Sequence, residues 1–321
     1  MGLIPAYFWG VNPKLPIERR VMPAVLALAA SLLFAPALKA QTAVSVTDTT
    51  GWNVWQKADL TYMSDSTPDQ QTGQGADDFA SNSTYAGFYQ KAGTIGGVDH
   101  LLFRARFDKF DGNDQWGNGG NFGIGMDVDG DGALDLIMMM KEASGNPNNR
   151  SRTITWGDPG TGANTGPSTT SWTFPTQTPI TLTTNTTYDV MQAGDGSLLN
   201  GNADMFLSFA VSFANLQAAI RAYTPYTAFT MGYDSRLSYI AFTSTQDNSL
   251  NQDLFGTTGN TTSTLTWAQL GAISGPANAY GIVPEPSTYA QMAAMLGVAG
   301  LAWWRRRRAD RRMPSTQSAA I

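Results

Sequence analysis

Two stretches of this chain alternate between apolar and polar residues with a period of two. Between residues 100 and 107 an apolar residue stands at every second position, and Arg104 and Arg106 fall between them. Residues 205–213 alternate in the same way, with Ser208, Ala210 and Ser212 between the apolar positions. A β-strand points successive side chains to opposite faces of its sheet, so this alternation predicts half-buried strands.

Further short apolar segments are separated by clusters of Gly, Asn, Asp, Ser and Thr. Many short strands bounded by turn residues are typical of an antiparallel β-sandwich, so we predict an all-β protein with a lectin-like or jelly-roll-like sandwich. Residues 214–223 form the one clear helix, because apolar side chains recur on one face. We expect a long loop at residues 64–80, and a last strand with a linker at residues 260–282. The remaining predicted strands are residues 52–60, 85–90, 122–127, 134–141, 153–156, 180–182, 187–192, 229–233 and 238–243.

The C-terminal end of the chain contains three segments in a fixed order. A turn-forming tripeptide comes first, sixteen uncharged residues (289–304) follow, and a cluster of arginines comes last. Sixteen residues would form a helix of about 24 Å, which is a short membrane span. The arginines would hold their end in the cytoplasm, so the folded part upstream would lie across the membrane. The tripeptide is Pro284, Glu285 and Pro286, and the first four arginines are Arg305, Arg306, Arg307 and Arg308.

This tripeptide, apolar span and arginine cluster resemble the PEP-CTERM sorting signal of Gram-negative bacteria. The resemblance covers about 30 residues, and its specificity lies in the order of the three segments. It implies transient contact with the inner membrane and with an exosortase, which would cleave the chain. It also implies release to the cell surface or the extracellular matrix.

The N-terminal end agrees with export. Lys14, Arg19 and Arg20 precede an apolar stretch from residue 21 to 34, and small residues up to Ala40 follow. This order predicts a secretory signal peptide, with cleavage after Ala40. The expected organisation is therefore a signal peptide at 1–40, a β-sandwich domain at 41–270 and a linker at 271–283. The sorting signal at 284–312 and a disordered tail at 313–321 complete it.

Between the two processing segments the chain is strongly acidic. Residues 41–283 contain 10 Lys and Arg against 22 Asp and Glu, a net charge of −12, and Glu142 is the one glutamate among the acids. Aspartate is a turn residue and a compact oxygen ligand, so this bias favours a loop-rich β protein with cation-binding loops. The negative charge argues against a nucleic-acid partner. The chain has no cysteine, so disulfides cannot stabilise it after export.

One acidic loop has the spacing of a calcium site. Within residues 127–135 aspartates occupy positions 1, 3, 5 and 9, and a glycine at position 6 allows a sharp turn. The loop is similar to the calcium loops of dockerins and thrombospondin type 3 repeats, but Met138 replaces the glutamate of an EF-hand at position 12. The alternative is a polar hairpin turn in which Asp-Gly pairs supply positive φ angles. The predicted Ca²⁺ ligands are Asp127, Asp129, Asp131, the carbonyl of Ala133, and Asp135.

Two further acidic loops have weaker spacing. Residues 195–204 begin and end with aspartate but have an irregular ligand order, which favours a turn. Asn248, Asn251 and Asp253 form another polar loop with a still weaker case.

Signatures of catalysis are scarce. His100 is the only histidine, it stands within a predicted strand, and no Gly-x-Ser-x-Gly motif or cysteine nucleophile is present. Trp116, Trp156, Trp172 and Trp267 would either stack on sugars or fill the core. We therefore expect a non-catalytic, calcium-stabilised surface or matrix protein for adhesion, matrix assembly or glycan binding, with extracellular polysaccharide as a partner. The alternatives are a secreted carbohydrate-active hydrolase and an ice-binding protein, although the threonines at 183–187 show no repeat period.

Overall fold

The computed structural model describes most of the chain between the two predicted processing segments. It covers residues 42–282 except 66, 72–77, 111–119, 143–151, 161, 176–177, 224, 259–260 and 279–280, together with residues 296–297, 300 and 303–304. The predicted signal peptide, the tripeptide at 284–286, the arginines at 305–308 and the tail lie outside the described residues. In the part that is described, no helix is both long enough and apolar enough to cross a membrane.

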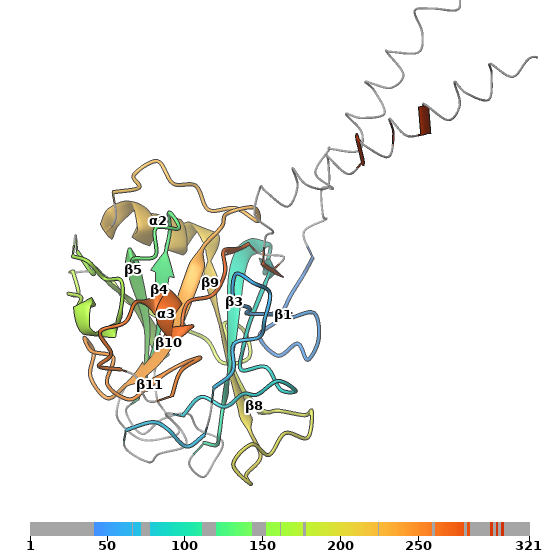
Figure 1. Ribbon diagram of the computed structural model, residues 1–321, viewed down its shortest axis with the longest axis vertical. Coiled ribbons are helices and arrows are strands. Elements are labelled where there is room, and N and C mark those ends of the chain that lie inside the picture. The colour runs from blue at the N-terminus through green and yellow to red at the C-terminus, as the bar shows by residue number, and fades with distance from the viewer. Residues whose placement is uncertain are drawn as a thin grey trace, which may run out of the picture. The chain divides into compact units, whose positions relative to one another are not determined.

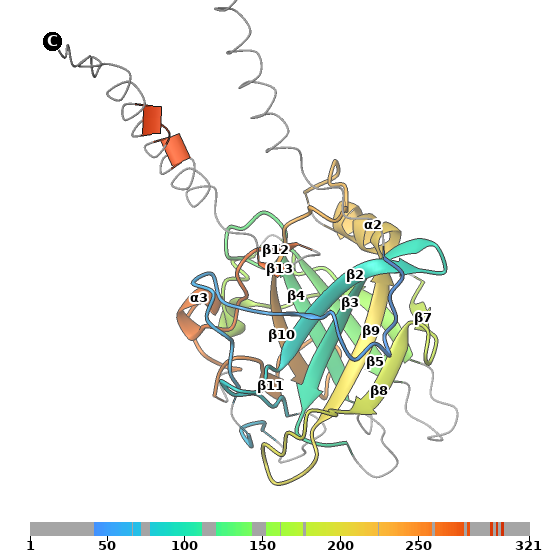
Figure 2. The same ribbon diagram turned by 90° about the vertical axis from the view of Figure 1, so that its right-hand side faces the viewer.

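Apart from one short pair, the described strands form two antiparallel sheets (Figures 1 and 2). The first sheet has five strands, and β3 lies at its centre between β2 and β9. The alternating segments of the sequence supply two of the three long strands in this sheet, β3 and β9, which pair over eight residues. In spatial order the strands are β1 (Asn53–Val54), β2 (Phe88–Ile95), β3 (Val98–Phe107), β9 (Met205–Ser212) and β8 (Tyr188–Gln192).

The second sheet has six strands, and β4 and β5 lie at its centre. A separate pair, β12 (Ala277–Asn278) and β13 (Gly281–Ile282), forms a small hairpin. In spatial order the six strands are β11 (Asp253–Leu254), β10 (Ser238–Ser244), β4 (Asn121–Asp127), β5 (Leu136–Glu142), β6 (Arg152–Gly157) and β7 (Ile180–Leu182).

Aromatic side chains join the two sheets across a shared hydrophobic core. The Trp55 ring stacks on Phe88 of the first sheet at 3.8 Å and on Tyr239 of the second sheet at 4.9 Å, measured between ring centroids. Phe122 of β4 and Phe209 of β9 meet at 5.7 Å. Burial of these large rings supplies much of the driving force for bringing the sheets together.

The outer face of the six-stranded sheet is also covered. Trp172 and Trp267 pack there against Ile137, Ile240 and Phe242. Trp267 opens the short helix α3 (Trp267–Leu270), and the 3₁₀ turn η4 (Pro167–Thr169) lies in another covering loop. Trp156 is buried in the central core instead. These three tryptophans are therefore core residues and not sugar platforms, and Trp116 lies outside the described residues.

The helix prediction is confirmed by α2 (Phe213–Tyr223), which buries Phe213, Leu216, Ala219 and Ile220. The strand predicted at residues 229–233 is wrong, because α2 binds this segment through its side chains. Arg221 donates to the carbonyl of Phe229, and the Met231 amide donates to Gln217. Main-chain groups satisfied in this way are not available to a sheet.

The strand predicted at residues 52–60 is mostly wrong, because only Asn53–Val54 pair with β2. A turn follows, in which the Lys57 amide donates to the carbonyl of Thr61, and Leu60 has a φ of 67°. The loop predicted at 64–80 contains no helix or strand among its described residues. Residues 260–282 hold α3 and the β12–β13 hairpin and not one last strand.

Candidate functional site

The predicted calcium loop connects β4 to β5 at one end of the six-stranded sheet. Asp127 organises this loop, because its two carboxylate oxygens accept hydrogen bonds from the amides of Gly130 at 2.7 Å and Gly132 at 3.0 Å. Both glycines have a φ above 80°, which L side chains rarely adopt. At the far end, Asp135 accepts from the Val128 amide at 2.7 Å and closes the loop.

Three of the four predicted carboxylates come together. Asp127, Asp129 and Asp135 each offer one oxygen, and these oxygens lie within 4.8 Å of one another. Asp131 lies outside this group and instead accepts from the Ala133 amide at 2.8 Å. Met138 is buried in the central core, so the position of the EF-hand glutamate serves packing here.

The electrostatics of the loop reflect crowding of negative charge. Burial, followed by the charges of Asp131 and Asp129, raises the pKa of Asp127. Burial and the charges of Asp129, Asp127 and Asp131 raise the pKa of Asp135 to about 6. The Tyr226 hydroxyl hydrogen-bonds to Asp129 and reaches the loop from beyond α2. A bound cation would offset this repulsion, although the same amide hydrogen bonds also suit a bare turn.

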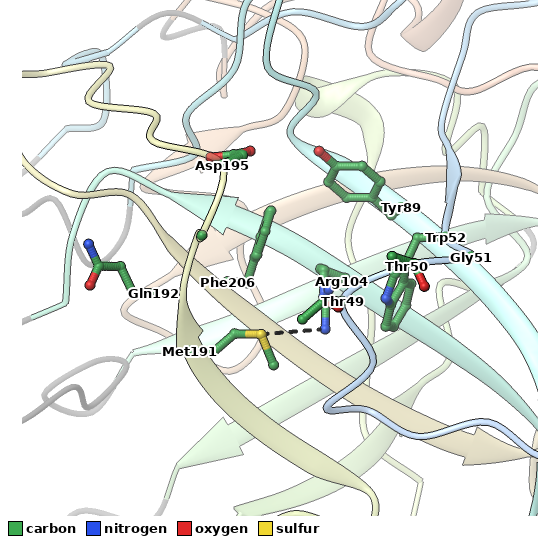
Figure 3. Close-up of a pocket in the computed structure, with 11 residues that line it drawn as sticks. Thr49, Thr50, Gly51, Trp52, Tyr89, Arg104, Met191, Gln192, Asp195 and Phe206 are labelled. Atoms are coloured by element: carbon green, nitrogen blue, oxygen red, sulfur yellow. Dashed lines mark hydrogen bonds between the residues drawn. The ribbon is translucent and has the colours of Figure 1, made fainter.

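A cavity of about 520 Å³ lies on the outer face of the five-stranded sheet. Its floor comes from Tyr89 of β2, Arg104 of β3 and Phe206 of β9, and residues 49–52 cover one side. Figure 3 shows Arg104 and Phe206 at the centre, with Trp52 and Tyr89 on one side and Gln192 on the other. The three aromatic rings are half-buried, so each retains an exposed part at the cavity.

Arg104 is the fixed charge of this cavity. Its guanidinium donates to the Ser208 hydroxyl at 2.8 Å and to the Val46 carbonyl at 2.9 Å, and it lies 4.2 Å from the Trp52 ring centroid. Only 3% of its surface is exposed, and burial lowers its pKa to about 10. The side chain therefore stays charged at neutral pH and holds Trp52 against the sheet.

Arg106, two residues along β3, binds the acidic loop at 195–204. It forms ion pairs with Asp195 at 2.5 Å and with Asp204 at 3.3 Å, and it also donates to Ser197. Partial burial would raise the pKa of Asp195, but hydrogen bonds from Arg106 and Ser197 outweigh it and lower the pKa to about 2. The aspartates at both ends of this loop thus neutralise the buried Arg106. Their ion pairs hold the turn at 195–204 against the five-stranded sheet.

His100 lies in β3, as predicted, and one nitrogen of its ring is 2.8 Å from the carbonyl oxygen of Val98. No sequence motif marks Trp52, Tyr89 or Phe206. The alternation at Arg104 and Arg106 is the signal that could have found two of them, because Tyr89 of β2 pairs with Arg104 and Phe206 of β9 pairs with Arg106.

No protein-family model matches this chain, and the searches of curated proteins and of solved structures gave no match.

Proposed function

We propose that this chain is an exported, non-catalytic glycan-binding protein of the cell surface or extracellular matrix, with a role in adhesion or matrix assembly. The observation that carries the proposal is the cavity on the outer face of the five-stranded sheet. Three half-buried rings, from Trp52, Tyr89 and Phe206, line it beside polar groups from Gln192 and Asp195. Aromatic faces stack on the apolar faces of sugars, and nearby amide and carboxylate groups bind hydroxyls.

The proposed architecture is a lectin-like or jelly-roll-like β-sandwich. Two antiparallel sheets that share one aromatic core support it. The proposed route to the surface is export by the signal peptide and sorting by an exosortase at the inner membrane, on the strength of the PEP-CTERM resemblance at Pro284–Pro286 and the arginine cluster.

Calcium is proposed as a stabilising ion at residues 127–135. Ca²⁺ takes oxygen ligands at about 2.3–2.6 Å, so oxygens that share one ion lie up to about 5 Å apart. The oxygens of Asp127, Asp129 and Asp135 meet this condition. The residues that would hold the ion are therefore these three, and a carboxylate oxygen that accepts one amide still has a lone pair for a cation.

Asp195 is the residue that distinguishes the glycan-binding proposal from the hydrolase alternative. This carboxyl is the one acid among the residues that line the cavity. Because Arg106 holds its pKa at about 2, Asp195 is an anion at neutral pH and is a poor proton donor to a glycosidic oxygen. Release of reducing sugars from a bacterial polysaccharide would favour the hydrolase and overturn the non-catalytic assignment.

Binding to an array of bacterial polysaccharides, followed by calorimetric titration, tests glycan recognition. Trp52→Ala removes one ring of the cavity and is expected to weaken binding at least fivefold, since truncation of a central aromatic residue costs about 1 kcal/mol or more. Tyr62→Ala is the matched control, because Tyr62 is 50% exposed and lies outside the cavity. Equal affinities of the two variants, or no binding by the unaltered protein, would contradict the proposal.

A further inference from the structure

Four aspartates converge at the β11 edge of the six-stranded sheet, away from the loop at 127–135. Asp65, Asp69 and Asp78 come from the segment before β2, and Asp253 is the first residue of β11. We call these four residues the buried aspartate cluster. Asp65 is 2% exposed, Asp78 and Asp253 are fully buried, and Asp69 is half-buried.

The carboxylates of this cluster are close to one another. Asp65, Asp69 and Asp253 each offer an oxygen within 4.8 Å of the others. Asp78 is attached to this group, because one of its oxygens accepts from the Asp69 amide at 3.4 Å. The next amide, that of Phe79, donates to Asp253 at 2.7 Å.

Backbone amides of the described chain donate hydrogen bonds to this cluster. Three of its members, Asp65, Asp78 and Asp253, form no ion pair with a described lysine or arginine. The Leu254 amide donates to Asp253 at 2.7 Å, and the Gly256 amide donates to Asp65. The ion pairs formed by the described lysines and arginines involve Asp48, Asp195, Asp204 and Asp247, and none involves Asp65, Asp78 or Asp253. This is unlike Arg106, which neutralises its acids directly.

Oδ1 of Asp65 and Oδ2 of Asp78 are buried, and neither has a hydrogen-bond partner among the described residues. A buried polar atom normally has a partner, and leaving it without one costs about 1–3 kcal/mol. The charge of Asp78 acts on both Asp65 and Asp253, which places its carboxylate beside theirs. The unpartnered oxygens thus indicate a ligand that accepts their lone pairs.

We propose that the buried aspartate cluster binds a hard divalent cation, with Ca²⁺ as the natural probe. The donor set contains oxygens only, which suits Ca²⁺, Mg²⁺ or Mn²⁺ rather than a metal that prefers nitrogen or sulfur. A polar cavity of about 640 Å³ reaches Asp65 and is lined by Ser64, Ser81, Asn82 and Thr257, so an ion has a path from solvent.

The test counts bound ions in the full chain by equilibrium dialysis with calcium after chelation. A variant with Asp129→Asn and Asp135→Asn disables the proposed loop site and leaves the cluster intact. We expect this variant to keep one tightly bound calcium per chain and to gain about 5–10 °C in melting temperature at saturation. No bound calcium in this variant would overturn the cluster site, whatever the glycan assay shows.

The complementary variant carries Asp65→Asn and Asp78→Asn. We expect it to lose the cluster's calcium and the associated thermal shift. It should melt at least as high as the unaltered protein in chelator, because neutral amides replace two carboxyl groups of a crowded, buried site. Folding of this variant is followed by the same melting curve. An unchanged calcium count would contradict the proposal even if the loop variant bound calcium.

Discussion

The loop at residues 127–135 and the buried aspartate cluster both crowd carboxylates, but the chain assembles them differently. The loop gathers its three converging acids within nine residues, and the amides that bind Asp127 and Asp135 belong to the loop itself. The cluster joins segments that lie 174 to 191 residues apart, through the bonds from Phe79 to Asp253 and from Gly256 to Asp65. A site of the first kind depends on local turns, and one of the second kind depends on the complete fold.

Arg106 provides a third case for this comparison. It neutralises Asp195 and Asp204 with a cation from the chain itself. The pKa of Asp195 falls to about 2, whereas that of Asp78 in the cluster rises to about 7. The contrast shows that the pKa of a crowded aspartate depends on whether a cation is within reach.

The largest difference between the two regions is expected for single truncations measured in chelator. Asp253→Ala should cost about 3 kcal/mol in the free energy of unfolding, because the buried Phe79 and Leu254 amides lose their acceptor. Asp129→Ala, in the exposed part of the loop, should cost about 0.5 kcal/mol. Urea unfolding measures the free energy of unfolding of both variants. Equal losses of stability would contradict the distinction between the cluster and the loop.

Within the loop, Asp127 should matter most. Asp127→Ala removes the acceptor of the Gly130 and Gly132 amides and should cost about 1.5 kcal/mol, as loss of a helix cap does. Asp131→Ala is the control, since Asp131 accepts from one exposed amide. Thermal unfolding in chelator checks this, and a larger loss for Asp131→Ala would show that the loop is organised elsewhere.

The Arg106 pair should show its own pH dependence. The pKa of Asp195 is lowered in the folded state, so its stabilisation is present above the ordinary value of 3.8 and is lost as pH falls through about 2. Asp195→Asn should cost about 1 kcal/mol at pH 7, after allowance for solvent screening, and only a small part of that near pH 2. Unfolding free energies of both proteins between pH 2 and 7 measure this. A difference that is constant with pH would rule out the ion pair as its source.

The smallest effect is expected at Asp131. This residue lies outside the converging group, so Asp131→Asn should leave calcium binding by the loop unchanged within error. Asp135→Asn should abolish it. Calorimetric titration on the background of Asp65→Asn and Asp78→Asn separates the two, and a clear loss with Asp131→Asn would restore the four-carboxylate arrangement that the spacing predicts.

The sequence predicted the long strands well because their alternation is a local property. The expected segments at 100–107, 205–213 and 238–243 correspond closely to β3, β9 and β10. The prediction failed at 229–233, where side chains of α2 bind the main chain. It also failed over most of 52–60, where a turn interrupts an apolar segment. Both errors come from contacts that periodicity cannot represent.

The same distinction between local patterns and long-range contacts applies to the candidate sites. The spacing of aspartates singled out the loop at 127–135, in which three of the four predicted carboxylates come together and Asp131 lies outside the group. Calcium binding by this loop stays a prediction. Asp253 lies in a polar segment with weak ligand spacing, and the residues around it in the sequence do not indicate that Asp65 lies beside it. The cavity at Trp52, Tyr89 and Phe206 could not be predicted either, because its three rings come from distant parts of the sequence. Trp52 precedes β1, Tyr89 lies in β2 and Phe206 lies in β9.

The hydrogen bonds from Phe79 to Asp253 of β11 and from Gly256, just after β11, to Asp65 also affect how the domain folds. Contacts between residues nearly two hundred positions apart close a long loop of chain, and such contacts tend to form late. The four aspartates of the cluster therefore remain hydrated until β11 has joined β10 and most of the aromatic core is in place. Their desolvation comes at the end of folding, when the core is already able to offset it.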